Sequence, residues 1–180
     1  MNEAPLPFPG VCARQIIKHS PRPARDMAFV TADAIAELAK RCMDWDEAAS
    51  TPEDWIAVLT PAVAGMHDGY EIARYLDDHS SVSPDAELVE ILDSWTGIVA
   101  QAQRTAVATW VALHNIIPEL AEGDACRFDG MDGVIVQIDR KHACYTVSIA
   151  AFGHLSAGER AAGVLGTSGL VLPYESVEAE

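Results

Sequence analysis

The chain has 180 residues, of which 49% are hydrophobic, and a formal net charge of −15. This apolar content is sufficient for a folded core, which excludes a wholly disordered protein. The negative charge opposes direct binding to nucleic acid or to an anionic membrane, because phosphate contacts require lysine and arginine.

The charge is divided unevenly along the chain. Residues 1–26 contain four basic and two acidic residues, and residues 27–122 contain four basic and 17 acidic residues. Residues 123–180 contain four basic and eight acidic residues. We expect these segments to be an extended proline-rich arm (1–26), an acidic helical domain (27–122) and a small β-barrel domain (123–180).

The arm is predicted from its prolines. Three prolines between residues 5 and 9 favour polyproline geometry, and Pro21 and Pro23 oppose a helix. Two interpretations are open, a flexible tail or an arm that docks on the chain's own β-domain or on a partner. The sequence also has no signal peptide, no apolar membrane span and no CxxC motif, which favours a cytoplasmic protein with reduced thiols.

Apolar residues recur at helical spacing in the first part of the acidic domain. The first helix is predicted to begin with Thr31 as its N-cap and to bury one face, formed by Ile35, Leu38, Ala39 and Cys42.

Three Ser/Thr-Pro pairs then indicate helix starts, because serine and threonine cap helices and proline fits the first helical position. They predict helices over 52–59 and 61–78 and a long helix over 84–117. Gly97 is the expected position of a bend in the long helix, and Pro118 is its expected end. The fold predicted for this domain is a helical bundle.

The periodicity changes at Gly123–Asp124 into short alternating segments punctuated by glycine. Strands are predicted at Ala125–Phe128, Gly133–Asp139 and Cys144–Ala150, followed by a hairpin of Val164–Leu165 and Leu170–Leu172. The predicted fold class is therefore α+β, an N-terminal acidic helical bundle followed by a small C-terminal β-barrel.

Several features of the last segment resemble the small barrels of the Src-homology-3-like type, including the KOW-type barrels of translation and transcription factors. They are Gly123–Asp124, Phe128, Gly130, Gly133–Val136, Tyr145–Val147 and Gly169–Val177. The resemblance implies a small barrel. KOW-type barrels that bind RNA present basic loops, whereas the corresponding turn here, Asp129–Asp132, is acidic. Direct nucleic-acid binding is therefore not expected.

Few residue patterns point to catalysis. His67 and Glu71 lie four residues apart on a predicted helix and could supply two metal ligands, but a site needs a third. Cys144 and His142 could form a nucleophile–base pair. A solvated helix face and a structural cysteine explain these patterns as well. We expect no cofactor, and a metal- or thiol-dependent enzyme is the least favoured hypothesis.

The acidic clusters of the helical domain are the strongest functional signal. The candidate partner-binding residues are Asp44, Trp45, Asp46, Glu47, Glu53, Asp54, Asp77 and Asp78. An aromatic residue among carboxylates can anchor a basic protein surface. Acidity that serves only solubility is the alternative explanation.

In size, acidity and lack of catalytic motifs, the chain resembles small phage-encoded inhibitors, including anti-restriction and anti-CRISPR proteins. This resemblance implies a non-enzymatic interaction protein whose acidic helices occupy the basic nucleic-acid-binding surface of a protein or ribonucleoprotein complex. The alternative is a phage or prophage structural or assembly factor that oligomerises through the barrel. A homodimer is left open by either interpretation.

Overall fold

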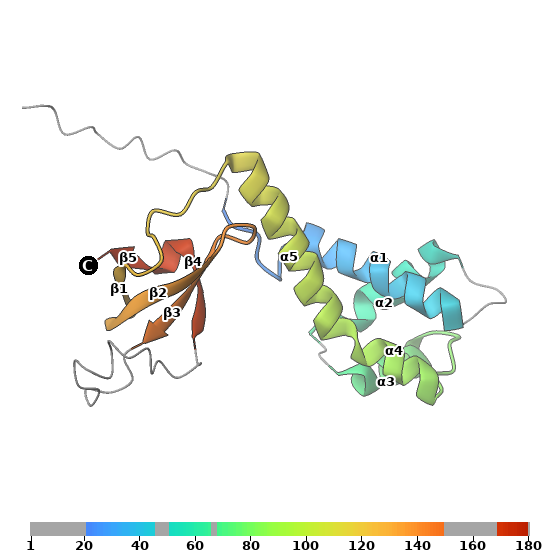
Figure 1. Ribbon diagram of the computed structural model, residues 1–180. Helices are drawn as coiled ribbons and strands as arrows, with labels where there is room; N and C mark the ends of the chain where they lie inside the picture. The colour runs from blue at the N-terminus through green and yellow to red at the C-terminus, as the bar shows by residue number, and fades with distance from the viewer. Residues whose placement is uncertain (1–20, 46–50, 66–67, 150–168, 180) are drawn as a thin grey trace, which may run out of the picture.

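A computed structural model describes residues 21–45, 51–65, 68–149 and 169–179, which form a helical part followed by an antiparallel sheet (Figure 1). The α+β class predicted from the sequence is confirmed. The helices are α1 (Ala28–Trp45), α2 (Pro52–Ala62), α3 (Gly69–His79), α4 (Ala86–Asp93) and α5 (Trp95–His114). The sheet contains β1 (Ala125–Phe128), β2 (Met131–Asp139), β3 (Cys144–Ile149), β4 (Leu170–Pro173) and β5 (Glu178–Ala179), with a 3-10 turn at Tyr174–Ser176.

Helix α1 begins at Ala28, three residues before the predicted N-cap. Thr31 lies inside the first turn, where its hydroxyl donates to the carbonyl of Met27 at 3.4 Å. The predicted apolar face is confirmed, because Ile35, Leu38, Ala39 and Cys42 are all buried. Burial without a polar partner raises the pKa of the Cys42 thiol to about 12.

Helix α2 begins as predicted but does not end at Thr60. Thr51 and Asp54 form a capping box, in which each side chain accepts a hydrogen bond from the other residue's backbone N–H. The helix continues through Pro61 to Ala62, so the prediction of a new start at Thr60–Pro61 was wrong. The next helix, α3, begins after Asp68, whose carboxylate accepts from the N–H groups of Tyr70 and Glu71.

The long helix predicted over 84–117 is two helices. Asp85 is the N-cap of α4, since its carboxylate accepts from the Leu88 N–H at 2.9 Å. The break lies at Ser94, where the hydroxyl donates to the Ile91 carbonyl at 2.5 Å, and Gly97 lies inside α5. Helix α5 ends at His114 because the next residue, Asn115, adopts a left-handed conformation. The helix therefore ends before Pro118, which was its predicted end.

The five strands are antiparallel neighbours in the order β4-β3-β2-β1-β5. Among the described residues, β4 and β5 do not pair with each other, so the sheet is not closed. β1 is placed as predicted, β2 begins two residues early and β5 was not predicted. The predicted strand at Val164–Leu165 lies outside the described residues.

Each part has its own hydrophobic core. The helices bury Trp55, Leu59, Ile72, Leu76 and Leu92, and one face of the sheet buries Cys126, Ile135, Tyr145, Val147 and Leu172. Helix α5 lies between the two parts in Figure 1, with the sheet on one side and the other helices on the other. Val107 and Val111 near its C-terminal end pack against Ala143, which joins the helix to the turn between β2 and β3.

Candidate functional site

The predicted partner-binding residues that the structure describes lie at the ends of three helices. Asp44 and Trp45 end α1, Glu53 and Asp54 are in the first turn of α2, and Asp77 and Asp78 are in the last turn of α3. Asp46 and Glu47 lie outside the described residues. We call the set of Asp44, Trp45, Glu53, Asp54, Asp77, Asp78, Asp85 and Glu87 the acidic end.

Trp45 connects three of these helix ends. Its indole Nε1 donates to the Asp85 carboxylate at the start of α4, at 3.1 Å. Its ring meets the buried ring of Trp55 in α2 edge-on, with centroids 6.2 Å apart and an angle of 74°. Trp45 is therefore half-buried, with one edge in the core and the rest at the surface.

Helix α3 is held against α4 by a hydrogen bond at its start and by a short connection at its end. At its start, the Gly69 N–H donates to the Asp93 carboxylate at the end of α4, at 2.7 Å. The end of α3 and the start of α4 are separated only by residues 80–85. The two helices are thus antiparallel neighbours, which brings Asp77 and Asp78 to the same end of the helical part as Trp45.

Some of these carboxylates already have a structural role. Hydrogen bonds from the backbone N–H and then from the hydroxyl of Thr51 hold the pKa of Asp54 below its ordinary value. Asp85 caps α4 and accepts from Trp45. Asp78 lies 3.9 Å from Arg74, a loose and exposed ion pair.

The remaining carboxylates are exposed and make no hydrogen bond or ion pair within the described residues. They are Asp44, Glu53, Asp77 and Glu87. Their negative charge is available to a partner. The acidic end therefore presents carboxylates around a half-exposed aromatic ring, a surface that can bind cationic groups.

Of the two catalytic hypotheses, only the thiol-dependent one has both of its residues among those that the structure describes. The Cys144 thiol lies 3.4 Å from the backbone carbonyl of His142, whereas the His142 ring is 2.7 Å from Asp139. His67 lies outside the described residues, and Glu71 is exposed. Among the described residues, no group of three or more His, Cys, Asp or Glu side chains is placed to hold a metal ion.

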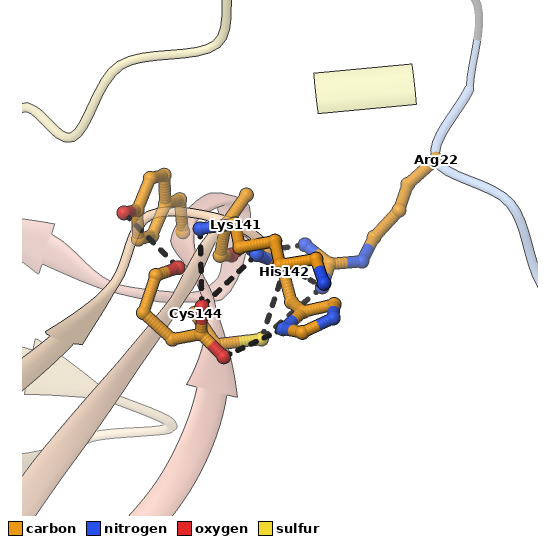
Figure 2. Close-up of polar contacts among 7 residues, drawn as sticks. Arg22, Lys141, His142 and Cys144 are labelled. Atoms are coloured by element: carbon orange, nitrogen blue, oxygen red, sulfur yellow. Dashed lines mark hydrogen bonds and ion pairs between the residues drawn. The ribbon is translucent and has the colours of Figure 1, made fainter. Parts of the chain in front are cut away.

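A polar cluster around Arg22 lies at the junction of the sheet and α5 (Figure 2), and the sequence singled out only its Cys144 and His142. The Arg22 guanidinium donates to the carbonyls of His142 and Ala143 at 2.7 and 3.0 Å. It also lies 3.2 Å from the Cys144 sulfur and 3.3 Å from the Glu175 carboxylate. Arg22 therefore fixes the turn between β2 and β3 from the N-terminal side of the chain.

The same N-terminal segment also holds helix α5. The Gln103 amide donates to the Pro23 carbonyl at 3.2 Å and accepts from the Arg25 Nε at 3.1 Å. Residues 22–25 thus bridge the sheet and α5, and the docking interpretation of the arm holds for this part of it. Residues 1–20 lie outside the described residues. The excess of basic residues in 1–26 was the sequence signal that could have indicated this contact.

Comparison with known proteins gives no relative. No family model, no curated protein and no solved structure matches the chain. Within the part of the chain that the structure describes, no helix has the length and apolar character needed to span a bilayer.

Proposed function

We propose that this protein is a non-enzymatic interaction protein whose acidic end binds a basic surface of a protein or ribonucleoprotein complex. In this proposal the carboxylates occupy a surface that otherwise binds nucleic acid, as in phage-type inhibitors of the anti-CRISPR or anti-restriction kind. The helices act as a rigid support, and the sheet provides a second surface.

The observation that carries the proposal is the position of three aspartates at helix C-termini. Asp44 is in the last turn of α1, and Asp77 and Asp78 are in the last turn of α3. A helix C-terminus carries a partial negative charge, so a carboxylate there destabilises the helix by about 0.3–1 kcal/mol at low salt. Helix stability therefore does not explain these residues, whereas recognition of a basic surface does.

The acids at helix N-termini require no such explanation. Glu53, Asp54, Asp85 and Glu87 lie where the helix dipole favours a negative charge, and two of them also cap their helices. They add to the same electrostatic field. The aromatic ring of Trp45 supplies the half-buried anchor that interface centres commonly contain.

The proposal is tested by neutralising charge at the acidic end. The test variant carries Asp44→Asn, Glu53→Gln and Asp77→Asn, three exposed residues with no partner among the described ones. The control variant carries Glu122→Gln, Asp129→Asn and Glu178→Gln, which removes the same charge from the segments around the sheet. Both are assayed against purified restriction endonucleases and CRISPR effector complexes for binding and for inhibition of DNA cleavage.

We expect binding to one such complex that duplex DNA displaces and that weakens as salt is raised. The test variant should bind at least about tenfold more weakly, while the control should retain most of the affinity. Equal losses in the two variants would show that net charge alone is responsible. Binding by the test variant at the wild-type affinity would refute the role of the acidic end.

A second candidate function is assembly through the sheet, and exposed valines favour it. Val134, Val136 and Val171 are 40%, 39% and 63% exposed. The strand register and the neighbours of Gly169 place them with Thr146 on the sheet face opposite the core. We propose for this alternative that the sheet is the barrel-like oligomerisation module of a phage structural factor. Sedimentation distinguishes the assembly function from the inhibitor function. A ring or large oligomer that dissociates when Val171→Asp is introduced would favour assembly.

A further inference from the structure

A basic cleft lies between helix α5 and the turn that joins β2 to β3. Its volume is about 780 Å³, within the range of small-molecule sites of roughly 300–1,000 Å³. Arg104 lines it from α5, and Lys141 and His142 line it from the turn. No carboxylate is among the residues that line it. This cleft is separate from the acidic end and does not depend on the function proposed for that surface.

Arg104 and Lys141 of this cleft differ from most of the other basic residues that the structure describes, because those form ion pairs with carboxylates. Lys40 and Arg41 pair with Glu37, Arg74 pairs with Asp78, and Arg127 pairs with Asp132. By contrast, Arg104, Lys141 and the adjacent Arg140 have no ion pair within the described residues. In a chain with a net charge of −15, unpaired cations that gather in one cleft indicate a site for an anion.

The walls of the cleft are held in place before any ligand binds. The Asp139 carboxylate accepts from the backbone N–H groups of Lys141 and His142, at 3.0 and 3.1 Å. Ala143 is fully buried against Val107 and Val111 of α5. Arg22 also binds this turn, through the carbonyls of His142 and Ala143 (Figure 2). A preorganised site loses less conformational entropy when it binds.

One wall of the cleft is apolar. Ala108, Ala112 and Leu113 follow one another along α5, and the Leu113 side chain is 77% exposed. The hydroxyls of Thr105 and Thr109 lie beside them and donate to backbone carbonyls one turn earlier, which leaves their oxygens free to accept hydrogen bonds. The cleft therefore offers cationic groups to one part of a ligand and an apolar wall to another.

We propose that this cleft binds a small organic anion, with a phosphate-type head group between Arg104 and Lys141 and an apolar body against Leu113. A long polyanion such as nucleic acid is disfavoured. Its charges beyond the cleft would meet the acidic helical part, whereas a small anion is screened from distant carboxylates over about 8 Å at physiological salt.

The test is a titration of the ¹⁵N-labelled full chain followed by amide chemical shifts at constant pH and ionic strength. The probes are phenyl phosphate, inorganic phosphate, benzoate and phenol. We expect saturable shifts at Thr105, Thr109, Lys141 and His142, with phenyl phosphate tighter than inorganic phosphate and phenol weakest. Tighter binding of benzoate than of phenyl phosphate would overturn the phosphate-type head group.

Three substitutions locate the site. Arg104→Gln and Lys141→Gln should each weaken the binding of phenyl phosphate about tenfold or more, because each removes a charge-assisted contact. Leu113→Ser should weaken the binding of phenyl phosphate, because it removes the apolar contact. The affinity for inorganic phosphate should stay the same, so the difference between the two probes becomes smaller. Arg74→Gln removes one exposed charge from α3 and is the matched control, expected to bind as the wild type does.

The positions changed in Arg104→Gln, Lys141→Gln and Leu113→Ser are exposed, so all three variants should unfold at the wild-type temperature. The proposal is overturned if no probe gives saturable shifts in the cleft. It is also overturned if Arg74→Gln weakens phenyl phosphate as much as Arg104→Gln does, since the effect would then be one of net charge.

Discussion

The hydroxyl of Tyr145 accepts a hydrogen bond from the Leu120 backbone N–H at 3.0 Å, and a second from the Glu119 N–H at the same distance. Tyr145 is 1% exposed and belongs to the core of the sheet. This one hydroxyl therefore fixes the segment that connects α5 to β1. Tyr145→Phe removes the acceptor and leaves two partly buried donors without it, so we expect a loss of about 1–3 kcal/mol in the free energy of unfolding.

Urea denaturation measures this loss, and Tyr70→Phe is its control. Tyr70 is 67% exposed, and its hydroxyl forms no hydrogen bond within the described residues. We expect the control to change stability by less than about 0.5 kcal/mol. A Tyr145→Phe variant as stable as the Tyr70→Phe variant would show that the two hydrogen bonds contribute no net stability.

Two glycines in helices should respond to alanine in opposite directions. A Cβ at Gly69 would lie 2.7 Å from the Val89 carbonyl oxygen and would also meet the Asp93 backbone. A Cβ at Gly97 would have no atom within 4 Å. We expect Gly69→Ala to destabilise the protein by roughly 1–3 kcal/mol and Gly97→Ala to stabilise it by about 0.5–1 kcal/mol. Thermal unfolding of both variants tests this, and a stabilised Gly69→Ala would contradict the close contact of α3 with α4.

Asp77 should affect stability and binding in opposite ways. Asp77→Asn removes a negative charge from the last turn of α3, so we expect it to raise the unfolding free energy by about 0.3–1 kcal/mol at low salt. The gain should disappear in high salt, where the dipole is screened. Glu71→Gln, in the first turn of the same helix, should lower stability by a similar amount. The same sign for both substitutions would argue against the dipole as the cause.

Asp139 should make stability depend on pH. Its partial burial favours the neutral form, but the hydrogen bonds and charge of His142 and the Lys141 N–H outweigh this and hold its pKa below the ordinary value of 3.8. A lowered pKa in the folded state means that the ionised carboxylate stabilises the fold above about pH 4, and that this contribution is lost as the pH falls through the folded pKa.

We therefore expect Asp139→Asn to be less stable than the wild type at pH 7, with the difference shrinking towards pH 3. Urea midpoints at pH 7, 5 and 3 measure it. Asp129→Asn is the control in another turn, because the Asp129 carboxylate makes no hydrogen bond or ion pair within the described residues, so its effect should vary little with pH. If Asp139→Asn is less stable than the wild type by the same amount at all three pH values, the side chain acts through the geometry of its hydrogen bonds and not through its charge.

The elements that could be predicted from the sequence are those with a local cause. The buried face of α1 followed from apolar spacing, and the start of α2 followed from Thr51 as a cap. The continuation of α2 past Thr60 and the break at Ser94 could not be predicted in the same way. Pro61 is tolerated in the last turn of α2, and Ser94 ends α4 through hydrogen bonds to Ile91 and Leu92 that no composition rule requires.

For the candidate sites, the sequence identified residue types but not their positions relative to one another. It indicated acids around Trp45, but the meeting of three helix ends depends on the packing of Trp45 against Trp55 and its contact with Asp85. The basic cleft combines Arg104 with Lys141, which are 37 positions apart in the chain. Only the docking of α5 against the sheet turn brings them together.

The contact of Arg22 with the sheet has a consequence for the order in which the protein folds. Its partners lie 120 to 153 residues further along the chain, so a growing polypeptide cannot form any of these contacts before His142 has been synthesised, nor the last of them before Glu175. The helical core includes no residue beyond Ala102 and can form much earlier. The residues that emerge near the beginning of synthesis thus form one of the last contacts to close. Unfolding that begins with the release of Arg22 would separate the sheet from α5 and leave the helical core folded.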